Sequence, residues 1–319
     1  MSMTATTPIL LCPGQGAQAV GMGKAWMERS QAAREVFAEA DAILGFSISK
    51  LCFEGPENEL NRTDMAQPAI FATTVACYRA LLETGEIVSD EGRSSWAAAA
   101  GLSLGEFTAL HIADAMDFDT GLRLVRLRGQ AMQEAAESTR SGMVALMGCE
   151  EEQARDLCTR AVAAGGNGDV LVPANLNCPG QVVVSGTEVA CDRALNIAGD
   201  MGMRAKALVV AGAFHSPVMR PAADCLIEVL EQADIRAPAI PVLSNVTARP
   251  HSDEVASIRT RLLDQLTHPV RWSASMQWLT KNIPGQLIEL APGKVLGGLM
   301  KRIDRQAKVE NFDQPPKAP

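Results

Sequence analysis

The sequence predicts an α/β fold in which a parallel sheet is interrupted by a smaller β-rich unit, and three observations support this. An apolar run at 9–12 and strands expected at 241–244 and 286–290 are each followed by a turn or loop and then by a helical pattern. The stretch 140–211 follows its own order of strands and helices. The 319 residues are 47% hydrophobic and 21% charged, which is sufficient for a large packed core.

The first half of the core extends to residue 139 and begins with a strand. The apolar run 9–12 ends in the PGQG of 13–16, a pattern typical of a buried strand that enters a glycine turn. Apolar residues at helical spacing predict helices over 24–44, 68–83 and 104–115. Alanine is a poor strand former, so we expect a strand at 96–100 only because Gly101 and a definite helix follow it.

The stretch 140–211 predicts a self-contained subdomain. Strands are expected at 143–147, 170–175, 181–184 and 205–210, and helices at 150–164 and 187–202. The tetrapeptide NCPG at 177–180 is a strong turn signal between the second and third strands. The order β-α-β-β-α-β is that of a ferredoxin-like unit.

The second half of the core resumes at residue 212. The strands at 241–244 and 286–290 alternate with helices expected over 217–233, 253–266 and 294–304. We therefore expect residues 1–139 and 212–319 to form one α/β core, into which the ferredoxin-like subdomain 140–211 is inserted.

Composition excludes several classes of protein. The net charge of −8 argues against general nucleic-acid binding, because phosphate contacts need clustered Lys and Arg. No apolar run reaches the roughly 18–20 residues of a membrane helix, and the start of the chain lacks the basic residues of a signal peptide. Eight cysteines without a CxxC pair indicate free thiols in a reducing cytosol. We expect a cytoplasmic protein without a membrane segment or metal site.

A nucleophile motif lies between a predicted strand and a predicted helix. Gly101-Leu102-Ser103-Leu104-Gly105 is a GxSxG, in which two glycines permit a sharp strand-to-helix turn. Such a turn holds the hydroxyl at a helix N-terminus, where backbone N–H groups favour an oxyanion. The alternative is a plain Gly-Ser loop. The long apolar helix that follows favours Ser103 as the nucleophile of an α/β-hydrolase-like core.

A serine nucleophile needs a base, and the sequence has four histidines. His215 lies in a loop of small residues just before a predicted helix, where a scaffold can present an imidazole. His111 is two turns along the helix from the serine, His268 lies in a turn, and His251 is expected to be solvated in a polar loop. The residues alone favour His215 and leave His111 and His268 open.

The glycine turn at 13–19 also satisfies the dinucleotide fingerprint GxGxxA. That fingerprint needs a second strand that ends in an acidic residue about 20 positions further on. Here the region is helical, and Glu35 and Glu39 lie on the helix. The turn therefore suits a backbone N–H of an oxyanion hole better than a nucleotide site.

Eight motifs occur in one order from residue 9 to residue 304. They are PGQGAQ with GMG (13–23), AQPAIF (66–71), GLSLGEF (101–107), RGQAMQEA (128–135), NLNCPGQVVVSG (175–186), AFHSPVM (213–219), QLTHPVRW (265–272) and APGKVLGGLMKRI (291–303). Through them the chain resembles the malonyl-CoA:acyl-carrier-protein transacylases and, more broadly, the acyltransferase domains of fatty-acid and polyketide synthases.

This resemblance implies a catalytic set. Ser103 would be the nucleophile and His215 its base. The backbone N–H groups of Gln15 and Leu104 would form the oxyanion hole. Gln265 would supply a carbonyl that orients the imidazole in place of the usual aspartate.

The resemblance also implies residues that bind substrate. Arg128 would pair with the free carboxylate of malonate, because a guanidinium forms two parallel bonds to a carboxylate. Residue type alone does not distinguish it from its neighbours Arg123 and Arg126. Three further residues would line the pocket: Gln67, Asn175 and Phe214. The ring of Phe214 would crowd an α-methyl and so favour malonyl over methylmalonyl.

The activity implied is transfer of malonyl from malonyl-CoA, through a malonyl-serine, to the phosphopantetheine thiol of an acyl carrier protein in fatty-acid synthesis. A monomer without metal or redox cofactor is expected. Two alternatives are an esterase or thioesterase with water as acceptor, and a non-catalytic docking module. The chain departs from its family at Leu102, where His is usual, and at Ala17, where Ser is usual.

Overall fold

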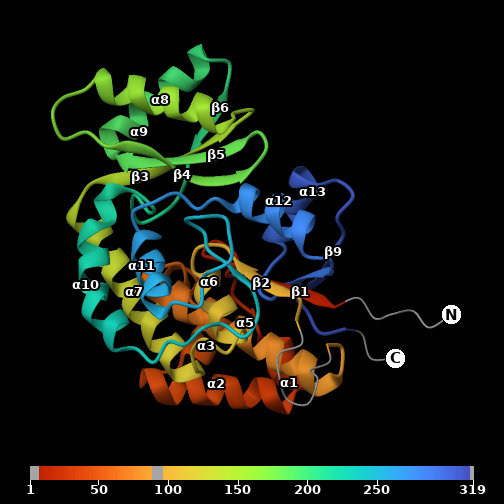
Figure 1. Ribbon diagram of the computed structural model, residues 1–319. Coiled ribbons are helices and arrows are strands. Elements are labelled where there is room, and N and C mark those ends of the chain that lie inside the picture. The colour runs from red at the N-terminus through yellow and green to blue at the C-terminus, as the bar shows by residue number, and fades with distance from the viewer. Residues whose placement is uncertain (1–6, 88–95, 317–319) are drawn as a thin grey trace.

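The computed structural model describes residues 7–87 and 96–316, which form two β-sheets with their helices (Figure 1). The larger sheet is parallel, in the order β7-β2-β1-β8-β9. Its strands are β1 (Pro8–Cys12), β2 (Ala98–Gly101), β7 (Val242–Leu243), β8 (Gln286–Leu290) and β9 (Val309–Phe312). The predicted fold class, an α/β fold with a parallel sheet and a separate smaller sheet, is confirmed.

Helices cover both faces of the parallel sheet. The segment before β2 supplies α1 (Lys24–Arg29), α2 (Gln31–Leu44), α3 (Ile48–Glu54), α4 (Glu57–Leu60) and α5 (Thr63–Thr84). After β2 come α6 (Gly105–Ile112) and α7 (Phe118–Ser138), and later α10 (Arg220–Gln232) and α11 (Val255–Asp264). All of these pack on one face of the sheet, whereas α12 (Trp272–Asn282) and α13 (Val295–Ile303) pack on the opposite face (Figure 1).

Alternation along β1 explains why both faces are covered. Leu10 and Cys12 belong to the core that α2, α5 and α7 share, whereas Ile9 and Leu11 pack with residues of α12 and α13. All four side chains are almost completely buried. A strand buried on both faces is an uninterrupted apolar run, as the sequence has here, because successive side chains point to opposite faces.

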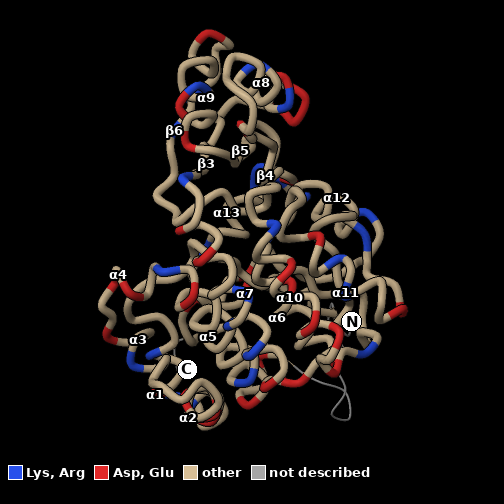
Figure 2. The backbone as a smooth tube through the Cα atoms, turned by 90° about the vertical axis from the view of Figure 1, so that its left-hand side faces the viewer, with Lys and Arg blue, Asp and Glu red and all other residues tan. Residues whose placement is uncertain are grey.

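The smaller sheet is antiparallel and has the ferredoxin-like strand order β4-β5-β3-β6. Its strands are β3 (Ser141–Met147), β4 (Leu171–Cys178), β5 (Gln181–Thr187) and β6 (Arg204–Ala207), covered by α8 (Glu151–Ala163) and α9 (Glu188–Asp200). It has a hydrophobic core of its own and stands above the larger part in Figures 1 and 2. The division into 1–139 with 212–319 and 140–211 stays a proposal.

One strand of the small sheet reaches the core. The N–H of Leu176 in β4 donates to the carbonyl of Val270, 2.9 Å away, and the N–H of Val270 donates to Ala174 at 2.8 Å. Asn175 lies between these two bonds and forms a parallel bridge with Val270. This contact fixes the end of β4 beside the carboxyl ends of the parallel strands.

Several elements differ from the sequence-based expectation. The helix expected over 24–44 is two helices, because Ser30 is extended and caps α2 with its side chain, which accepts from the N–H of Ala33. The helix expected from residue 68 begins at Thr63 and contains Pro68. The sequence pattern did not predict α3, α4, α7, α12 or β9.

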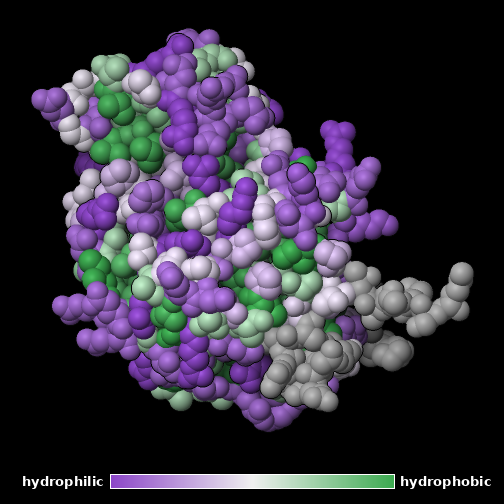
Figure 3. Space-filling model, viewed as in Figure 1, coloured by the Kyte–Doolittle hydropathy of each residue, from purple (hydrophilic) through white to green (hydrophobic). Residues whose placement is uncertain are grey.

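Charged and apolar residues are mixed over the surface of the molecule (Figures 2 and 3). Acidic and basic residues are interspersed over both parts of the molecule (Figure 2), and the face in Figure 3 carries separate small hydrophobic areas. Among the described helices, none is long and apolar enough to span a bilayer. Residues 1–6, which entered the signal-peptide expectation, lie outside the described residues.

Candidate active site

Ser103 lies on a tight turn between β2 and α6, with φ of 54°. The two flanking glycines make the turn possible. A Cβ on Gly101 would lie 1.8 Å from the carbonyl carbon of Gly105, and a Cβ on Gly105 would lie 2.2 Å from the carbonyl oxygen of Cys12. Strand, turn and helix are therefore packed backbone against backbone, in the sharp strand-to-helix turn that the GxSxG predicts.

Asn245 forms two hydrogen bonds with this turn, and the sequence did not predict it as a site residue. Its Oδ1 accepts from the N–H of Ser103 at 2.6 Å, and its Nδ2 donates to the carbonyl of Gly101 at 2.7 Å. The residue follows β7, the strand next to β2. A polar residue directly after a parallel strand, at the edge where such sheets bind ligands, is the signal that could have found it.

His215 meets the serine. Its Nε2 lies 2.8 Å from Ser103 Oγ, and its Nδ1 lies 2.7 Å from the backbone carbonyl of Gln265. A carbonyl only accepts, so Nδ1 carries the proton and Nε2 is the atom that can accept the serine proton. Burial, reinforced by the charge of Arg128, lowers the pKa of His215 from 6.5 to about 4. The imidazole is therefore neutral, and a competent base, at neutral pH.

The other three histidines lie away from the hydroxyl. His111 is buried with Nδ1 3.0 Å from the carbonyl of Met116, and His268 is exposed with Nδ1 2.8 Å from the carbonyl of Asp264. The expectation that His251 is solvated is wrong. Its side chain is buried, because the loop after β7 folds back beneath α6 and places Nε2 2.7 Å from Glu106 Oε1.

Arg128 projects from α7 to the same hydroxyl. Its Nη2 donates to Ser103 Oγ at 3.0 Å and to Gln265 Oε1 at 2.9 Å, and its Nη1 donates to Gln67 Oε1 at 2.7 Å. The residue is 1% exposed, and burial lowers the pKa of the guanidinium to about 10. Among the described residues, no carboxylate pairs with it and its Nε has no hydrogen-bond partner.

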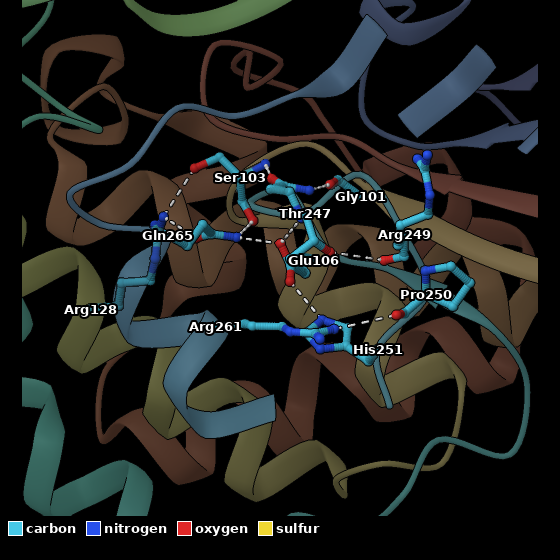
Figure 4. A network of polar contacts seen from close by, with 11 residues as sticks. Gly101, Ser103, Glu106, Arg128, Thr247, Arg249, Pro250, His251, Arg261 and Gln265 are labelled. Carbon is cyan, nitrogen blue, oxygen red and sulfur yellow. Dashed lines mark hydrogen bonds and ion pairs between the residues drawn. The ribbon is translucent and has the colours of Figure 1, made fainter. Parts of the chain in front are cut away.

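A buried polar network lies beneath the serine (Figure 4). Gln265 Nε2 donates to the carbonyl of Ser103 at 3.0 Å and to Glu106 Oε2 at 2.7 Å. The same Oε2 accepts from the N–H of Asn245 at 2.9 Å. Gln265 thus contributes two groups to the site: its backbone carbonyl contacts His215, and its side chain connects Arg128 to Glu106.

A cavity of about 650 Å³ opens above Ser103 and His215. It lies between the core and the small sheet, and Asn175 and Phe214, two of the predicted pocket residues, line it. Its apolar lining includes Leu102, Met132, Met143, Val183, Leu208, Val210, Val295 and Leu299. Its polar lining includes Gln18, Asn58, Asn61, Arg62, Gln133, Asn177 and Gln181. Such a mixture of apolar and polar groups suits an organic substrate that carries polar groups of its own.

Other predicted site residues lie behind this cavity or at its edge. Gln15 is on the cavity wall, and a Cβ on Gly14 would lie 2.2 Å from the carbonyl of Leu102, so the first glycine turn closely approaches the nucleophile turn. Leu104 is buried at the N-terminus of α6. Gln67 is buried against Arg128 instead of facing the cavity. The described residues contain no cluster of side chains suited to a metal ion.

The arrangement of a serine, a neutral histidine base and two nearby backbone turns is one for acyl transfer. A model of the acyl transferase domain matches residues 9–312. The chain belongs to the acyl transferase family.

Its relatives share nearly the whole length of this acyl transferase. A malonyl CoA-acyl carrier protein transacylase of Bacillus subtilis is 40% identical over 306 residues, which are 96% of this chain and 93% of the relative. The protein of the same name from Escherichia coli K12 is 38% identical over 304 residues, 95% of this chain and 94% of the relative.

Solved structures show the same fold. The malonyl-CoA:acyl carrier protein transacylase of Xanthomonas oryzae superposes with a TM-score of 0.89 at 40% identity, covering 98% of this acyl transferase and 96% of that chain. A malonyl-transacylase in complex with its type II polyketide synthase acyl carrier protein gives a TM-score of 0.90 at 36% identity, with 97% of each chain covered.

Proposed function

We propose that this acyl transferase moves a malonyl group from malonyl-CoA to the phosphopantetheine thiol of an acyl carrier protein. The observation that carries the proposal is the guanidinium of Arg128, which is buried beside Ser103 Oγ without a carboxylate partner among the described residues. A buried charge without a carboxylate in direct contact is costly, so the site suits an acyl group that brings its own carboxylate. The names of the relatives support the same donor and acceptor.

The first half of the reaction forms a malonyl-serine ester. His215 Nε2 takes the proton of Ser103 Oγ while Oγ bonds to the thioester carbonyl carbon. The tetrahedral intermediate then collapses, its carbon–sulfur bond breaks, and the sulfur of CoA receives the proton from the imidazolium. The backbone carbonyl of Gln265 holds the imidazole through Nδ1 in both steps.

The second half transfers the group to the carrier. The phosphopantetheine thiol gives its proton to His215 as its sulfur attacks the ester carbonyl, and the carbon–oxygen bond to Ser103 breaks. Ser103 Oγ then takes the proton back from the imidazolium. The sequence of steps is ping-pong and uses no cofactor of the enzyme's own, since the phosphopantetheine belongs to the carrier.

The oxyanion of each intermediate would be held by the backbone N–H groups of Gln15 and Leu104. Within the described part of the chain, neither N–H donates to another protein group. Leu104 is the N-cap residue of α6, where the helix dipole adds positive potential. The close approach at Gly14 brings the loop of Gln15 to the same place.

Arg128 would bind the malonyl carboxylate through the edge formed by Nε, which is unpartnered, and Nη2, which contacts Ser103 Oγ. Gln67 and Gln265 would hold the guanidinium in place. Asn175 and Phe214 would bound the acyl pocket from the cavity wall. A role in fatty-acid synthesis, a cytoplasmic location and a monomeric state stay predictions.

Radiolabelled malonyl-CoA tests the proposal directly. We expect a stable label on the wild-type protein, absent from Ser103→Ala, that is discharged when holo-acyl carrier protein is added. Rapid release of free malonate in the absence of carrier would instead identify a thioesterase. A protein that takes up no label would be a docking module, and the transferase assignment would be wrong.

A further inference from the structure

Glu106 is a buried carboxylate with no assigned role in the reaction proposed above. It is the second residue of α6, three positions after Ser103, and it is 0% exposed. Three N–H donors converge on it: the backbone of Asn245 and the side chain of Gln265 on Oε2, and Nε2 of His251 on Oε1. A buried carboxylate is costly unless hydrogen bonds compensate for its lost hydration, and these three donors do so.

Glu106, together with the backbone carbonyl of Ser103, determines the orientation of the side-chain amide of Gln265. An ionised carboxylate only accepts hydrogen bonds, so the amide must turn its Nε2 to Glu106 and to the carbonyl of Ser103. Its Oε1 is then left facing Arg128, and it accepts from Nη2 at 2.9 Å. The opposite orientation would place two donors against each other at Arg128 and an oxygen against the carboxylate.

The orientation of Gln265 in turn aims the guanidinium. The nitrogen that donates to Gln265 Oε1 is the one that contacts Ser103 Oγ, at 3.0 Å. The other terminal nitrogen is held by Gln67. Figure 4 shows Arg128, Gln265 and Glu106 in this order beneath the serine. The negative charge of Glu106 also raises the pKa of Arg128, which opposes the larger effect of burial.

We propose that Glu106 is a positioning residue: it fixes the amide of Gln265 so that Arg128 is held against Ser103, ready for the carboxylate of the acyl group. This inference rests on the proposed function, since it concerns how the malonyl group is selected. Glu106 touches neither the serine hydroxyl nor the imidazole, so it acts on selectivity through Gln265.

Two substitutions separate orientation from charge. Glu106→Gln keeps an oxygen for Gln265, because the backbone N–H of Asn245 is a fixed donor at the same position and requires an acceptor there. The new amide nitrogen would then face His251, whose Nε2 can accept after a change of tautomer. Glu106→Ala removes this acceptor and leaves Gln265 Nε2 only the carbonyl of Ser103.

The test compares kcat/KM for malonyl-CoA with kcat/KM for acetyl-CoA. In Glu106→Ala we expect the malonyl-to-acetyl ratio to fall about tenfold, the worth of one charge-assisted hydrogen bond, mainly through a higher KM for malonyl-CoA. In Glu106→Gln we expect a ratio within about threefold of wild type. In an Arg128→Ala background, Glu106→Ala should change the ratio no further, since Arg128 is the group through which Glu106 acts.

A merely structural role for Glu106 predicts a different result. Both variants would then lose malonyl and acetyl transfer equally and in proportion to their loss of thermal stability, and this outcome would overturn the inference. An equal fall of the ratio in Glu106→Gln and Glu106→Ala would overturn it as well, because charge and not orientation would be responsible.

A second variant covers the case in which Glu106→Ala does not fold. Gln265→Met keeps the backbone carbonyl that contacts His215 and removes only the amide between Arg128 and Glu106. Its malonyl-to-acetyl ratio should fall to the same extent, and an unchanged ratio would contradict the inference. A wild-type protein that fails to transfer malonyl would instead overturn the proposed function, independently of either variant.

Discussion

Ser103 and His215 are 112 residues apart in the chain, they meet with Oγ and Nε2 2.8 Å apart, and both have a positive φ, of 54° and 57°. Non-glycine residues adopt this conformation at a cost, and they keep it only where the surroundings hold them. Here hydrogen bonds hold both turns in this conformation. Asn245 holds the N–H of Ser103, and the hydroxyl of Ser216, next to His215, donates to the carbonyl of Ala213 at 2.6 Å.

Removal of either partner should abolish transfer. In Ser103→Ala no ester can form, and in His215→Gln no base takes the proton, so we expect kcat to fall about a thousandfold or more in each case. Quantitative transfer assays with malonyl-CoA and holo-carrier measure this. His268→Gln, at an exposed histidine, is the matched control and should retain wild-type activity. A comparable loss in the control would contradict the assignment of the base.

Arg128→Ala should reverse the acyl preference. Without the guanidinium the malonyl carboxylate has no partner, so we expect kcat/KM for malonyl-CoA to fall about a hundredfold. Transfer of acetyl should persist or improve, because a neutral acyl group no longer meets a buried charge. Arg123→Ala removes an exposed arginine of the same helix and should change neither rate. An unchanged preference in Arg128→Ala would disprove its role.

The sequence predicts the parts of the fold where one pattern dominates. The run 9–12 is apolar on both faces and corresponds to β1, and the strand expected at 286–290 corresponds to β8. By contrast, α7 carries Arg128 yet is not predicted, because Gly121 and Gly129 interrupt a charged segment. These glycines permit close packing with α5: a Cβ on Gly121 would lie 2.6 Å from the ring of Phe71, and one on Gly129 2.8 Å from the carbonyl of Thr63.

In the candidate site, too, some residues follow from the sequence and others only from the structure. Ser103 follows from a local motif, and the structure places His215, Arg128 and Gln265 around it, as the resemblance implies. Asn245 and His251 could not be found in this way, because their contacts join loops that only the tertiary fold brings together. From the sequence, a histidine in a loop rich in polar residues is expected to be solvated. Only the structure shows that the buried carboxylate of Glu106 lies opposite His251.

The pH dependence of the transfer rate should depend on the charge of Arg128, because this charge lowers the pKa of His215. In the proposed mechanism the neutral form of His215 is the base, so activity should be lost only as the pH falls through about 4, the lowered pKa of this imidazole. Arg128→Met removes one of the two causes of that lowering and leaves burial, so the pKa should rise while staying below 6.5. The acid limb of the rate profile should move to higher pH with it.

NMR titration of the four histidines measures this pKa directly, with the signal of His215 identified by its absence from His215→Gln. The bound malonyl carboxylate should have the same effect as the substitution, because it neutralises Arg128. A pKa of His215 that falls or stays constant in Arg128→Met would contradict the electrostatic coupling between these residues.

Asn245→Asp should impair the enzyme although the two side chains are nearly equal in size. One carboxylate oxygen can still accept from the N–H of Ser103, but the other would face the carbonyl of Gly101, where Nδ2 now donates. We expect kcat to fall about tenfold or more. Asn167→Asp, in an exposed loop, is the control for the charge change, and equal effects of the two substitutions would contradict the role of Asn245.

Gly105→Ala tests the packing on which the nucleophile depends. The new Cβ would lie 2.2 Å from the backbone oxygen of Cys12, which no rotamer can relieve, so β1 and α6 must separate. We expect a loss of about 2 kcal/mol or more in the free energy of unfolding, together with lower activity, because the loop of Gln15 follows β1.

Gly298→Ala provides the comparison, because a Cβ at this exposed position of α13 would have nothing within 4 Å. There the better helix propensity of alanine should raise stability by about 0.5–1 kcal/mol. Chemical denaturation of both variants measures the difference, and a Gly105→Ala protein as stable as wild type would show that strand and helix do not need this contact.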